Sequence, residues 1–489
     1  MQTKSYRPWT PRQAYLLPPS PTDWLPENHL AYFLLDVIER LDLSPIEAAI
    51  AEKDPRGERP YSPRMLLAVL IYGYCVGVFS SRKLARATYE DVAFRVLCAG
   101  VHPHFTTVNQ FRLGYRETFA GLFVQVLRLC KRAGLVKLGH VSIDGTKILA
   151  NASKHKAMSY DRMQEEEARL RAEINELLAN ADAADRADDE RYGVGVADED
   201  LPEELARREA RVARIEQAMA ALEREAAEAR AAELRKRAAG QREKAQDSSV
   251  DEVERRRSAT RAAKSEARAD ELDPPDDDDP PPSASDDLPR HRVPTEPNGK
   301  PDPKAQRNFT DPDSRIMVKD GAFVQAYNAQ IAVDAKAQVI VAQAVTNQAP
   351  DQEHLLPVLD RVEDALGRPP RRLSADAGYY SDANVAGCEA RNIDGYVAVG
   401  RTPHADTPNP QPVVSATRAA MRDKLASPDG HAVYSRRKVI AEPPFGQIKS
   451  AQGFRRFLLR GVAKVRCEWA LVCSTHNLLK LYRAGLAQA

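Results

Sequence analysis

The chain has 489 residues, 71 Lys or Arg against 70 Asp or Glu, and a formal net charge of +1, so it is long enough for two or three domains with real cores. Its six cysteines form no C-x-x-C pair and no His/Cys cluster of zinc spacing, which predicts buried, reduced thiols rather than a disulfide framework or a zinc site. The N-terminus lacks a signal-peptide core, and the longest apolar stretch, 66–79, is too short to span a bilayer. We therefore expect a soluble intracellular protein.

Charge is strongly segregated along the chain. Residues 431–489 carry eleven Lys or Arg against two acids, a local net of +9, whereas 271–287 carry eight acids and no base, a local net of −8. This asymmetry favours a polyanion-binding region beside a solvated acidic linker. A basic helix that merely faces solvent would give the same local charge and remains an open alternative.

Residues 1–135 are predicted to be a helical N-terminal, DNA-binding domain that follows a Pro-rich arm. Helices are expected at Leu30–Leu41, from Ser62-Pro63 to about Val76, after Ser80-Ser81, and from Thr106-Thr107. The helix after Ser80-Ser81 would carry Leu84, Ala85, Val92 and Val96 on one face. Basic residues on the polar faces would suit a helix-turn-helix unit, although ordinary helix packing explains the pattern equally well; they are Arg82, Lys83, Arg86 and Arg112.

Residues 136–160 are predicted to begin an α/β catalytic domain, which a helical insert then interrupts. A buried strand over 138–143 ends at Asp144-Gly145. In 161–270 an Ala-, Glu- and Arg-rich composition with heptad spacing predicts an antiparallel helical hairpin that turns near 191–195. Its apolar seam comprises Leu170, Ile174, Leu177, Val212, Ile215, Met219, Leu222, Ala226 and Ala229. The acidic, Pro-rich segment 271–306 is predicted to be disordered.

Residues 307–489 are predicted to complete the catalytic domain. Strands at 323–333 and 338–345 form a hairpin, 355–366 is a helix, and a strand at 371–375 delivers Asp376. A further strand follows at 395–399, and the chain is mostly helical from Tyr434 onward. Strand, hairpin, helix, strand, helix, strand and helix, in this order, is the order of a ribonuclease-H-like mixed sheet.

Three isolated acids are the candidate catalytic residues: Asp144, Asp376 and Glu442. Asp144 and Asp376 each follow a short apolar run, and Glu442 lies in a basic segment. Their carboxylate oxygens are the kind of ligand that hard divalent cations prefer. Two ions about 3.5–4 Å apart can hold the attacking and leaving oxygens of a phosphodiester displacement, so the set indicates a nuclease or a DNA strand transferase. Any one of the three alone would more often be a turn, cap or surface residue.

Four other polar residues have weaker claims to a role at the site. Asp351 and Glu353 open a predicted helix, where carboxylates are common caps, so they are weaker metal candidates. Asn328 and Gln330 lie on a predicted strand and are expected to be structural.

Three motifs resemble the DDE motifs of bacterial insertion-sequence transposases. They are Ile143-Asp144-Gly145-Thr146, Ala375-Asp376-Ala377-Gly378-Tyr379, and the run in which Glu442 precedes Lys449 by seven residues. The resemblance extends to the closing stretch from Gly453-Phe454-Arg455-Arg456-Phe457 to Asn477-Leu478-Leu479, and to the N-terminal Tyr72-Gly73-Tyr74, Ser80-Ser81-Arg82 and Phe111-Arg112. It covers about 1–160 and 305–485.

The resemblance implies a DNA transposase in which Asp144, Asp376 and Glu442 hold two Mg²⁺ or Mn²⁺ ions. Water would free a 3′-hydroxyl at the element end, and that hydroxyl would attack target DNA, without ATP or a covalent protein intermediate. Phosphate or base contacts would come from Lys449, Arg437 or Lys438, Tyr379, Arg455 and Arg456. Counting back from Glu442 puts Lys438 at the family's arginine position and Arg437 one residue away, which leaves open which of the two faces the phosphate.

The resemblance also implies partners and a setting. The partners would be the terminal inverted repeats of the element and target DNA, bound by a homodimer in the bacterial cytoplasm at the nucleoid, without a membrane. Two alternatives remain: a catalytically silent DNA-binding protein on the same fold, and a nuclease that only hydrolyses.

Overall fold

A computed structural model describes residues 21–52, 59–192, 201–274, 288–400 and 415–486, which form two units. One unit comprises residues 1–135, 447–453 and 470–489, and the other comprises 136–446 and 454–469. The predicted Pro-rich arm, the glycines of the predicted hairpin turn and residues 275–287 of the acidic segment lie outside the described residues.

The N-terminal part of the first unit is helical, as predicted. Its helices are α1 (Leu30–Glu39), α2 (Ser44–Ala51), α3 (Pro63–Cys75), α4 (Ser81–Glu90), α5 (Val92–Leu97), α6 (Phe105–Gly114) and α7 (Arg116–Arg132). The single helix expected through Val96 is wrong, because Asp91 has an extended backbone and its carboxylate caps α5 at the N–H groups of Ala93 and Phe94. Likewise α6 is capped by the His104 ring rather than by the threonines that follow it.

Arg112 is not on a polar face, contrary to prediction. Its side chain is buried and donates hydrogen bonds to the Tyr74 hydroxyl, the Phe79 carbonyl and the Asn109 side chain. A guanidinium has five donors, so several buried acceptors offset its burial and give it a structural role.

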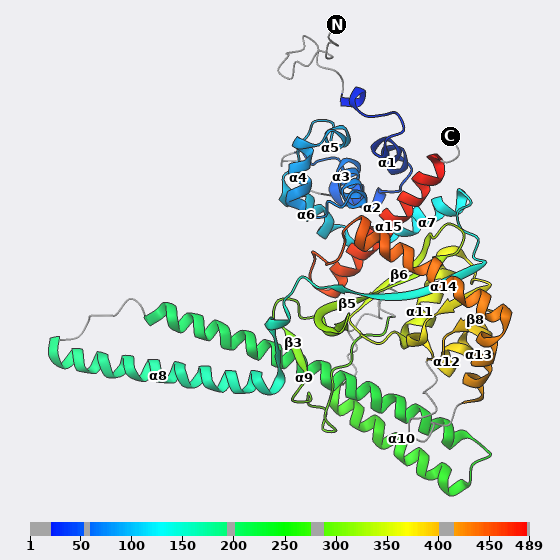
Figure 1. The fold of residues 1–489 in the computed structure, drawn as a ribbon. Helices are drawn as coiled ribbons and strands as arrows, with labels where there is room; N and C mark the ends of the chain where they lie inside the picture. Colours follow the sequence, from blue (N-terminus) through cyan, green and yellow to red (C-terminus); the bar gives the residue numbers. More distant parts are fainter. Residues whose placement is uncertain (1–20, 53–58, 193–200, 275–287, 401–414, 487–489) are drawn as a thin grey trace, which may run out of the picture. The chain divides into compact units, whose positions relative to one another are not determined.

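The second unit is built on the ribonuclease-H-like mixed sheet that the sequence predicts (Figure 1). The strand order is β4-β5-β1-β7-β8, with β6 also paired to β5. Strand β5 runs antiparallel to β1, β4 and β6, while β1, β7 and β8 are parallel. The strands are β1 (His140–Leu149), β4 (Arg315–Lys319), β5 (Ala322–Asp334), β6 (Ile340–Thr346), β7 (Arg372–Ala375) and β8 (Asp394–Val397). Strand β4 was not predicted, and β1 continues past its predicted end at Ile143.

Helices cover this sheet. The helix α11 (Leu355–Leu366) buries Leu355, Val358, Leu359, Val362 and Leu366 at helical spacing and packs against β5 and β6. The helix α14 (Pro428–Gly446) packs against β1, β5, β7 and β8 (Figure 1). The remaining helices of the second half are α12 (Asp382–Ala390), α13 (Ala416–Ala426) and α15 (Val462–Leu486).

The helix α14 contains Pro443 and Pro444 in its interior, so Glu442 does not start a helix. A π-helix, Gln447–Ala451, follows directly. Interior prolines remove backbone donors, and a widened turn nearby is one way in which a helix accommodates them.

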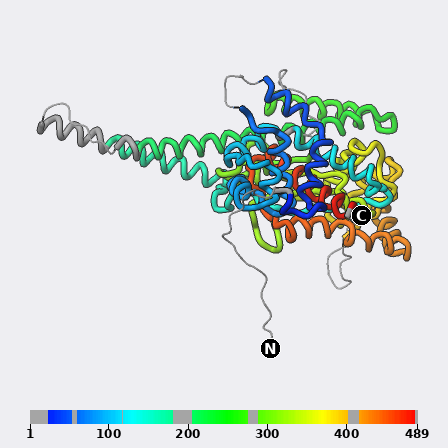
Figure 2. Tube along the Cα trace, turned by 90° about the horizontal axis from the view of Figure 1, so that it is seen from above, coloured from blue at the N-terminus to red at the C-terminus, as the bar shows by residue number. Residues whose placement is uncertain are grey.

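The charged insert forms three long helices, of which the sequence predicted two. They are α8 (Tyr160–Tyr192), α9 (Leu201–Gln246) and α10 (Glu252–Leu272). Helices α8 and α9 lie side by side (Figure 2), and Leu170 packs in one cluster with Val212, Ile215 and Leu222. The third helix packs extensively along α9, through an apolar cluster of Ala231, Leu234 and Ala269 and through ion pairs such as Arg242 with Glu266. Because its apolar contacts are mostly alanines, its sequence shows no heptad pattern.

The prediction of disorder over 271–306 is wrong for its described parts: Glu271 and Leu272 belong to α10, and 288–306 is ordered as well. Val293 and Ala305 are buried in the cluster at the α8–α9 seam. The segment then leads into β3 (Gln306–Asn308), which pairs with β2 (Ala157–Ser159). A few apolar anchors on an existing seam are enough to order a polar segment that could not form a core of its own.

The cysteines are buried and reduced, as the sequence analysis predicts. All six cysteines are free and buried. Among the described helices, none is both long and apolar enough to cross a membrane.

Buried His140 predicts a specific loss of stability in mild acid. Burial, together with the charges of Arg436 and Arg372, lowers the pKa of His140 to about 4, and its Nε2 lies 2.9 Å from Ser374 Oγ. Since the unfolded pKa is about 6.5, folding favours the neutral ring, and that contribution is present above pH 6.5 and lost as the pH falls towards 4.

We expect the unfolding free energy of the wild type to fall between pH 7 and pH 5 by roughly 1–2 kcal/mol more than that of His140→Gln. Urea unfolding at the two pH values measures this difference. Equal losses in both proteins would show that His140 titrates normally.

Candidate active site

The two predicted aspartates meet where β1 and β7 stop pairing. The last β1–β7 pair is Ser142 with Ser374, and Asp144 and Asp376 each lie two residues further along. Asp144 lies within β1, and Asp376 is the first residue after β7, where it caps a short 3₁₀ helix. The two carboxylates lie close enough to interact, because the Asp376 carboxylate raises the pKa of Asp144. The sheet therefore brings together two acids separated by more than 200 residues of sequence.

Asp144 is largely buried, and this raises its proton affinity. Its side chain is 15% exposed, and burial raises the pKa of Asp144 to about 6. The Arg437 guanidinium, whose Nη1 lies 3.3 Å from Asp144 Oδ2, lowers this pKa, whereas the Asp376 and Asp351 carboxylates raise it. Asp376 and Asp351 are therefore close enough to Asp144 for their negative charges to disfavour its ionised form.

The helix α14 presents Arg437 and Tyr434 to these acids. The two residues are three positions apart and therefore share a helix face. Burial raises the pKa of the Tyr434 phenol, and the nearby Asp376 and Asp144 carboxylates raise it further. Arg437 pairs with Asp144, whereas Lys438 is exposed. Which of the two contacts a phosphate stays a prediction.

The third predicted acid is not gathered with the first two. Glu442 lies on α14 beyond Arg437 and is exposed. Throughout the described ranges, no group of three or more His, Cys, Asp or Glu side chains is arranged to hold a metal ion. Lys449 falls in the segment 447–453, which belongs to the first unit.

Tyr379 does not contact DNA as predicted, because it is fully buried. Its hydroxyl donates a hydrogen bond to Gln330 Oε1, and burial raises the pKa of Tyr379 well above its usual range. With no exposed ring face it cannot stack on a base, and it instead fixes the orientation of the Gln330 amide.

Sequence reasoning missed the role of Asp351. Its Oδ1 accepts hydrogen bonds from Asn328 Nδ2 at 2.7 Å and from Gln330 Nε2 at 2.8 Å, and Lys147 Nζ lies 3.2 Å away. Asn328 and Gln330 are two buried amides at alternate positions of β5, in the central part of the strand between Gln325 and Asp334. That spacing was a usable signal, since buried amides on one strand face need a shared polar partner.

Arg455 and Arg456 are exposed on a segment that extends the sheet. Phe454 and Phe457 on either side are buried, and the Phe457 N–H donates to the Leu149 carbonyl at the end of β1. The apolar anchors therefore hold the backbone against β1 while the two guanidinium groups face outward.

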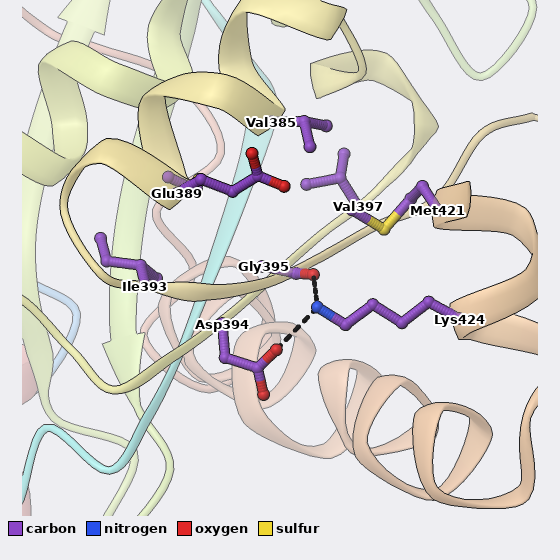
Figure 3. Close-up of a pocket in the computed structure, with 9 residues that line it drawn as sticks. Val385, Glu389, Ile393, Asp394, Gly395, Val397, Met421 and Lys424 are labelled. Carbon is purple, nitrogen blue, oxygen red and sulfur yellow. Dashed lines mark hydrogen bonds and ion pairs between the residues drawn. The ribbon is translucent and has the colours of Figure 1, made fainter. Parts of the chain in front are cut away.

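A cavity of about 160 Å³ lies elsewhere in this unit, between β8, α12 and α13 (Figure 3). Lys424 crosses its mouth, bonded to the Asp394 carboxylate and the Gly395 carbonyl, and Val385, Val397 and Met421 supply apolar walls. It contains none of the predicted site residues, and Lys424 and Asp394 within it form an ion pair with each other.

In the first unit, α4 packs against α6 and carries exposed Arg82, Lys83 and Arg86. This arrangement is compatible with a helix-turn-helix contact to DNA. The DNA-binding role of these three side chains stays a prediction.

The fold and the paired aspartates define the class of protein: a ribonuclease-H-like enzyme for phosphoryl transfer. Comparison with protein families gives two matches, residues 292–478 to the family described as Transposase DDE domain and residues 19–113 to that described as Transposase domain (DUF772). No curated protein and no solved structure matched the chain. The first match includes Asp376 and Glu442 but begins after Asp144, which the sheet places beside Asp376.

The chain belongs to the DDE-type transposases of the insertion-sequence kind, enzymes of DNA transposition. Such enzymes bind DNA and generally use divalent metal ions. The chemistry of the donor set here fits such an ion, because the clustered aspartates supply hard oxygen ligands and an excess of negative charge.

Gly145 tests how closely the site is packed. A Cβ there would lie 2.3 Å from Gln330 Nε2 and 3.0 Å from Asp351 Oδ1, both held by hydrogen bonds. We expect Gly145→Ala to lower stability by about 1–3 kcal/mol and DNA cleavage at least tenfold, measured by urea unfolding and a nicking assay.

Gly139→Ala is the matched control, since a Cβ at Gly139 meets no atom within 4 Å. Its stability and cleavage should stay close to those of the wild type. Equal effects of the two substitutions would mean that loss of glycine, and not crowding of the acids, causes the defect.

Proposed function

We propose that this transposase cleaves element ends and transfers strands with Asp144, Asp376 and Glu442 as its catalytic carboxylates. The observation that supports the proposal is that the parallel strands β1 and β7 deliver Asp144 and Asp376 to one region of the sheet, while α14 packs against both strands and pairs its Arg437 with Asp144. Glu442 lies on that same helix, so the element that neutralises Asp144 also carries the third carboxylate.

The residues would hold Mg²⁺ or Mn²⁺, with two ions expected. When bound, such ions supply Lewis-acid stabilisation of the attacking and leaving oxygens. Arg437 already neutralises part of the charge on Asp144, so a metal ion would compete with this guanidinium for the carboxylate. The protein contributes fixed acids, a partly water-excluded site and a cation that remains near the phosphate.

The proposed reaction has two displacements at phosphorus. In the first, water attacks the phosphodiester at an element end, and the P–O3′ bond breaks to leave a free 3′-hydroxyl. In the second, that hydroxyl attacks a phosphodiester of target DNA, forming a new P–O bond and releasing a target 3′-hydroxyl. The first step consumes one water and one phosphodiester and leaves a 5′-phosphate beside the free 3′-hydroxyl. The second step exchanges one phosphodiester for another, and neither step needs ATP.

The DNA partners would be the terminal inverted repeats of the element and the target duplex. Arg455 and Arg456 are proposed to contact backbone phosphates beside β1, and Arg437 and Lys449 to contact phosphates near the scissile bond. A homodimer acting on paired ends, in the bacterial cytoplasm at the nucleoid, would suit this chemistry.

A cleavage and strand-transfer assay on DNA carrying the flanking element ends tests the function. The wild type should give nicked and joined products with Mg²⁺ and none with EDTA, and Asp144→Asn and Asp376→Asn should lower product at least a hundredfold. Binding without metal-dependent product would favour a silent DNA-binding protein, and nicking without joining would favour a nuclease.

The variant Glu442→Gln tests whether Glu442, which is exposed and not grouped with Asp144 and Asp376, takes part in catalysis. We expect it to abolish cleavage while the dissociation constant for end DNA in EDTA changes less than threefold, because the substitution removes charge but little volume. Unchanged cleavage would remove Glu442 from the catalytic set and leave the two aspartates in place.

Arg455→Ala/Arg456→Ala tests the proposed backbone contacts. Loss of two phosphate contacts should weaken binding regardless of DNA sequence and should lower the slope of log K against log salt by about 2. Arg169→Ala is the control, since Arg169 lies on α8 and pairs with Glu166 and Glu173. An unchanged salt slope in the double variant would show that the two arginines only face solvent.

A further inference from the structure

A pocket of about 360 Å³ lies between α4 and α6 in the first unit, two helices that pack against each other (Figure 1). Small-molecule sites are mostly apolar, whereas the wall of this pocket is polar apart from one aromatic ring. A wall of this kind suits a ligand that presents many hydrogen-bonding groups. The residues of the wall that bear on this ligand are Ser80, Arg82, Phe105, Thr106, Asn109 and Gln110.

Contacts inside the unit hold two of these side chains in place. The buried Arg112 donates from Nη2 to Asn109 Oδ1 at 3.0 Å, so the Nδ2 group of Asn109 lies on the side away from Arg112. The Arg82 guanidinium lies over the Phe105 ring, 5.1 Å from its centroid, and this cation–π contact keeps it beside the pocket. Side chains that are already oriented lose less conformational entropy when a ligand binds.

The charges around the pocket favour an anionic partner. Residues 92–116 contain no Asp or Glu. Arg82 and Lys83 are exposed in the first turn of α4, which contains no acid, and Ser80 makes no side-chain cap there. Cations at this end of a helix oppose its dipole, so the stability of α4 does not explain these two residues. Phosphate groups of a bound partner would offset the unfavourable charge.

The exposed face of α6 is polar, uncharged and free of long side chains. Thr106, Gln110 and Gly114 are exposed at four-residue steps, and Asn109 lies next to Gln110 in the pocket wall. Asn and Gln amides form paired hydrogen bonds with adenine in the major groove, and a Thr methyl group can contact thymine. In a helix-turn-helix unit the first helix crosses the DNA backbone, and residues near the start of the second helix contact base edges.

We propose that α6 reads base sequence at the element ends, with Gln110 and Asn109 contacting base edges in the major groove while Arg82 and Lys83 of α4 contact the flanking phosphates. This inference rests on the proposed function, because it gives that function the surface that selects its DNA. Base contacts are useful where the sequence is fixed, as in a repeat present at both ends of an element. The surface is therefore assigned to the end DNA and not to the target.

The test is binding of the full chain to two duplexes in EDTA, one taken from an element end and one with the same bases in scrambled order. Gln110 is exposed and alanine is a strong helix former, so Gln110→Ala should fold. We expect Gln110→Ala to weaken binding to the end duplex about tenfold and to leave binding to the scrambled duplex within twofold. A wild type without end preference, or a variant that keeps it in full, would overturn the proposal.

The variant Arg82→Ala/Lys83→Ala separates phosphate contacts from base contacts. It should weaken binding to both duplexes alike and lower the slope of log K against log salt by about 2. Arg128→Ala is the matched control, since Arg128 is exposed on α7 and is not part of the pocket wall, and its affinities should stay within twofold of wild type. Loss of end preference in the double variant, with an unchanged salt slope, would contradict the assignment of base reading to α6.

Replacing single base pairs of the end duplex locates the contact. At least one replacement should weaken binding of the wild type and have no effect on Gln110→Ala. If every replacement changes the affinities of the two proteins by the same factor, Gln110 contacts no base. The proposal then fails, whether or not the variant folds well.

Asp144→Asn separates this inference from the proposed function. It should keep the wild-type preference for end DNA and lose cleavage. If Gln110→Ala keeps its end preference while Asp144→Asn loses cleavage, the proposed chemistry stands and the assignment of α6 fails. If Gln110→Ala loses its end preference while Asp144→Asn still cleaves, the assignment of α6 stands and the catalytic proposal fails.

Discussion

The parallel pairing of β1 with β7 is the constraint on which the site depends. Backbone hydrogen bonds fix the register of these strands up to Ser142 and Ser374; beyond that point β1 stays paired with β5 through Asp144, while β7 ends just before Asp376. A shift of one residue would turn one aspartate to the opposite face of the sheet. The buried, apolar lengths of both strands prevent such a shift, so the core of the sheet sets the distance between the acids.

Placing several carboxylates together costs free energy, and the structure offsets this with cations from two directions. Lys147 projects from β1 to Asp351, and Arg437 projects from α14 to Asp144. Both pairs are largely shielded from water, so removing one partner would leave an uncompensated charge. A helix that carries a neutralising arginine and a further acid, Glu442, suits a site whose charge must change when metal and DNA bind.

The helical insert explains why the first aspartate is so far from the others in sequence. The chain leaves the sheet after β1, forms α8, α9 and α10, and returns through β3, which pairs with β2 close to the point of departure. Entry and exit are therefore adjacent, and a long insertion need not disturb the sheet. The family match that begins at residue 292 is consistent with this, since the insert separates Asp144 from the matched segment.

The sequence by itself determined the elements whose pattern is local. The apolar spacing of α11, the hairpin of β5 and β6, the heptad seam and the positions of Asp144 and Asp376 after apolar runs all follow from residues close together in the chain. It did not reveal β4 or α10, whose short or alanine-rich patterns carry little periodic signal, nor the order of 288–306, which depends on a seam formed elsewhere.

Only the tertiary structure decided which polar side chains share a site. Arg112 and Tyr379 are buried, Arg437 pairs with Asp144 while Lys438 and Glu442 are exposed, and Asp351 lies close to Asp144 and Asp376. Burial and electrostatic neighbours are set by which surfaces pack together, and a single sequence records the residue types without recording those contacts.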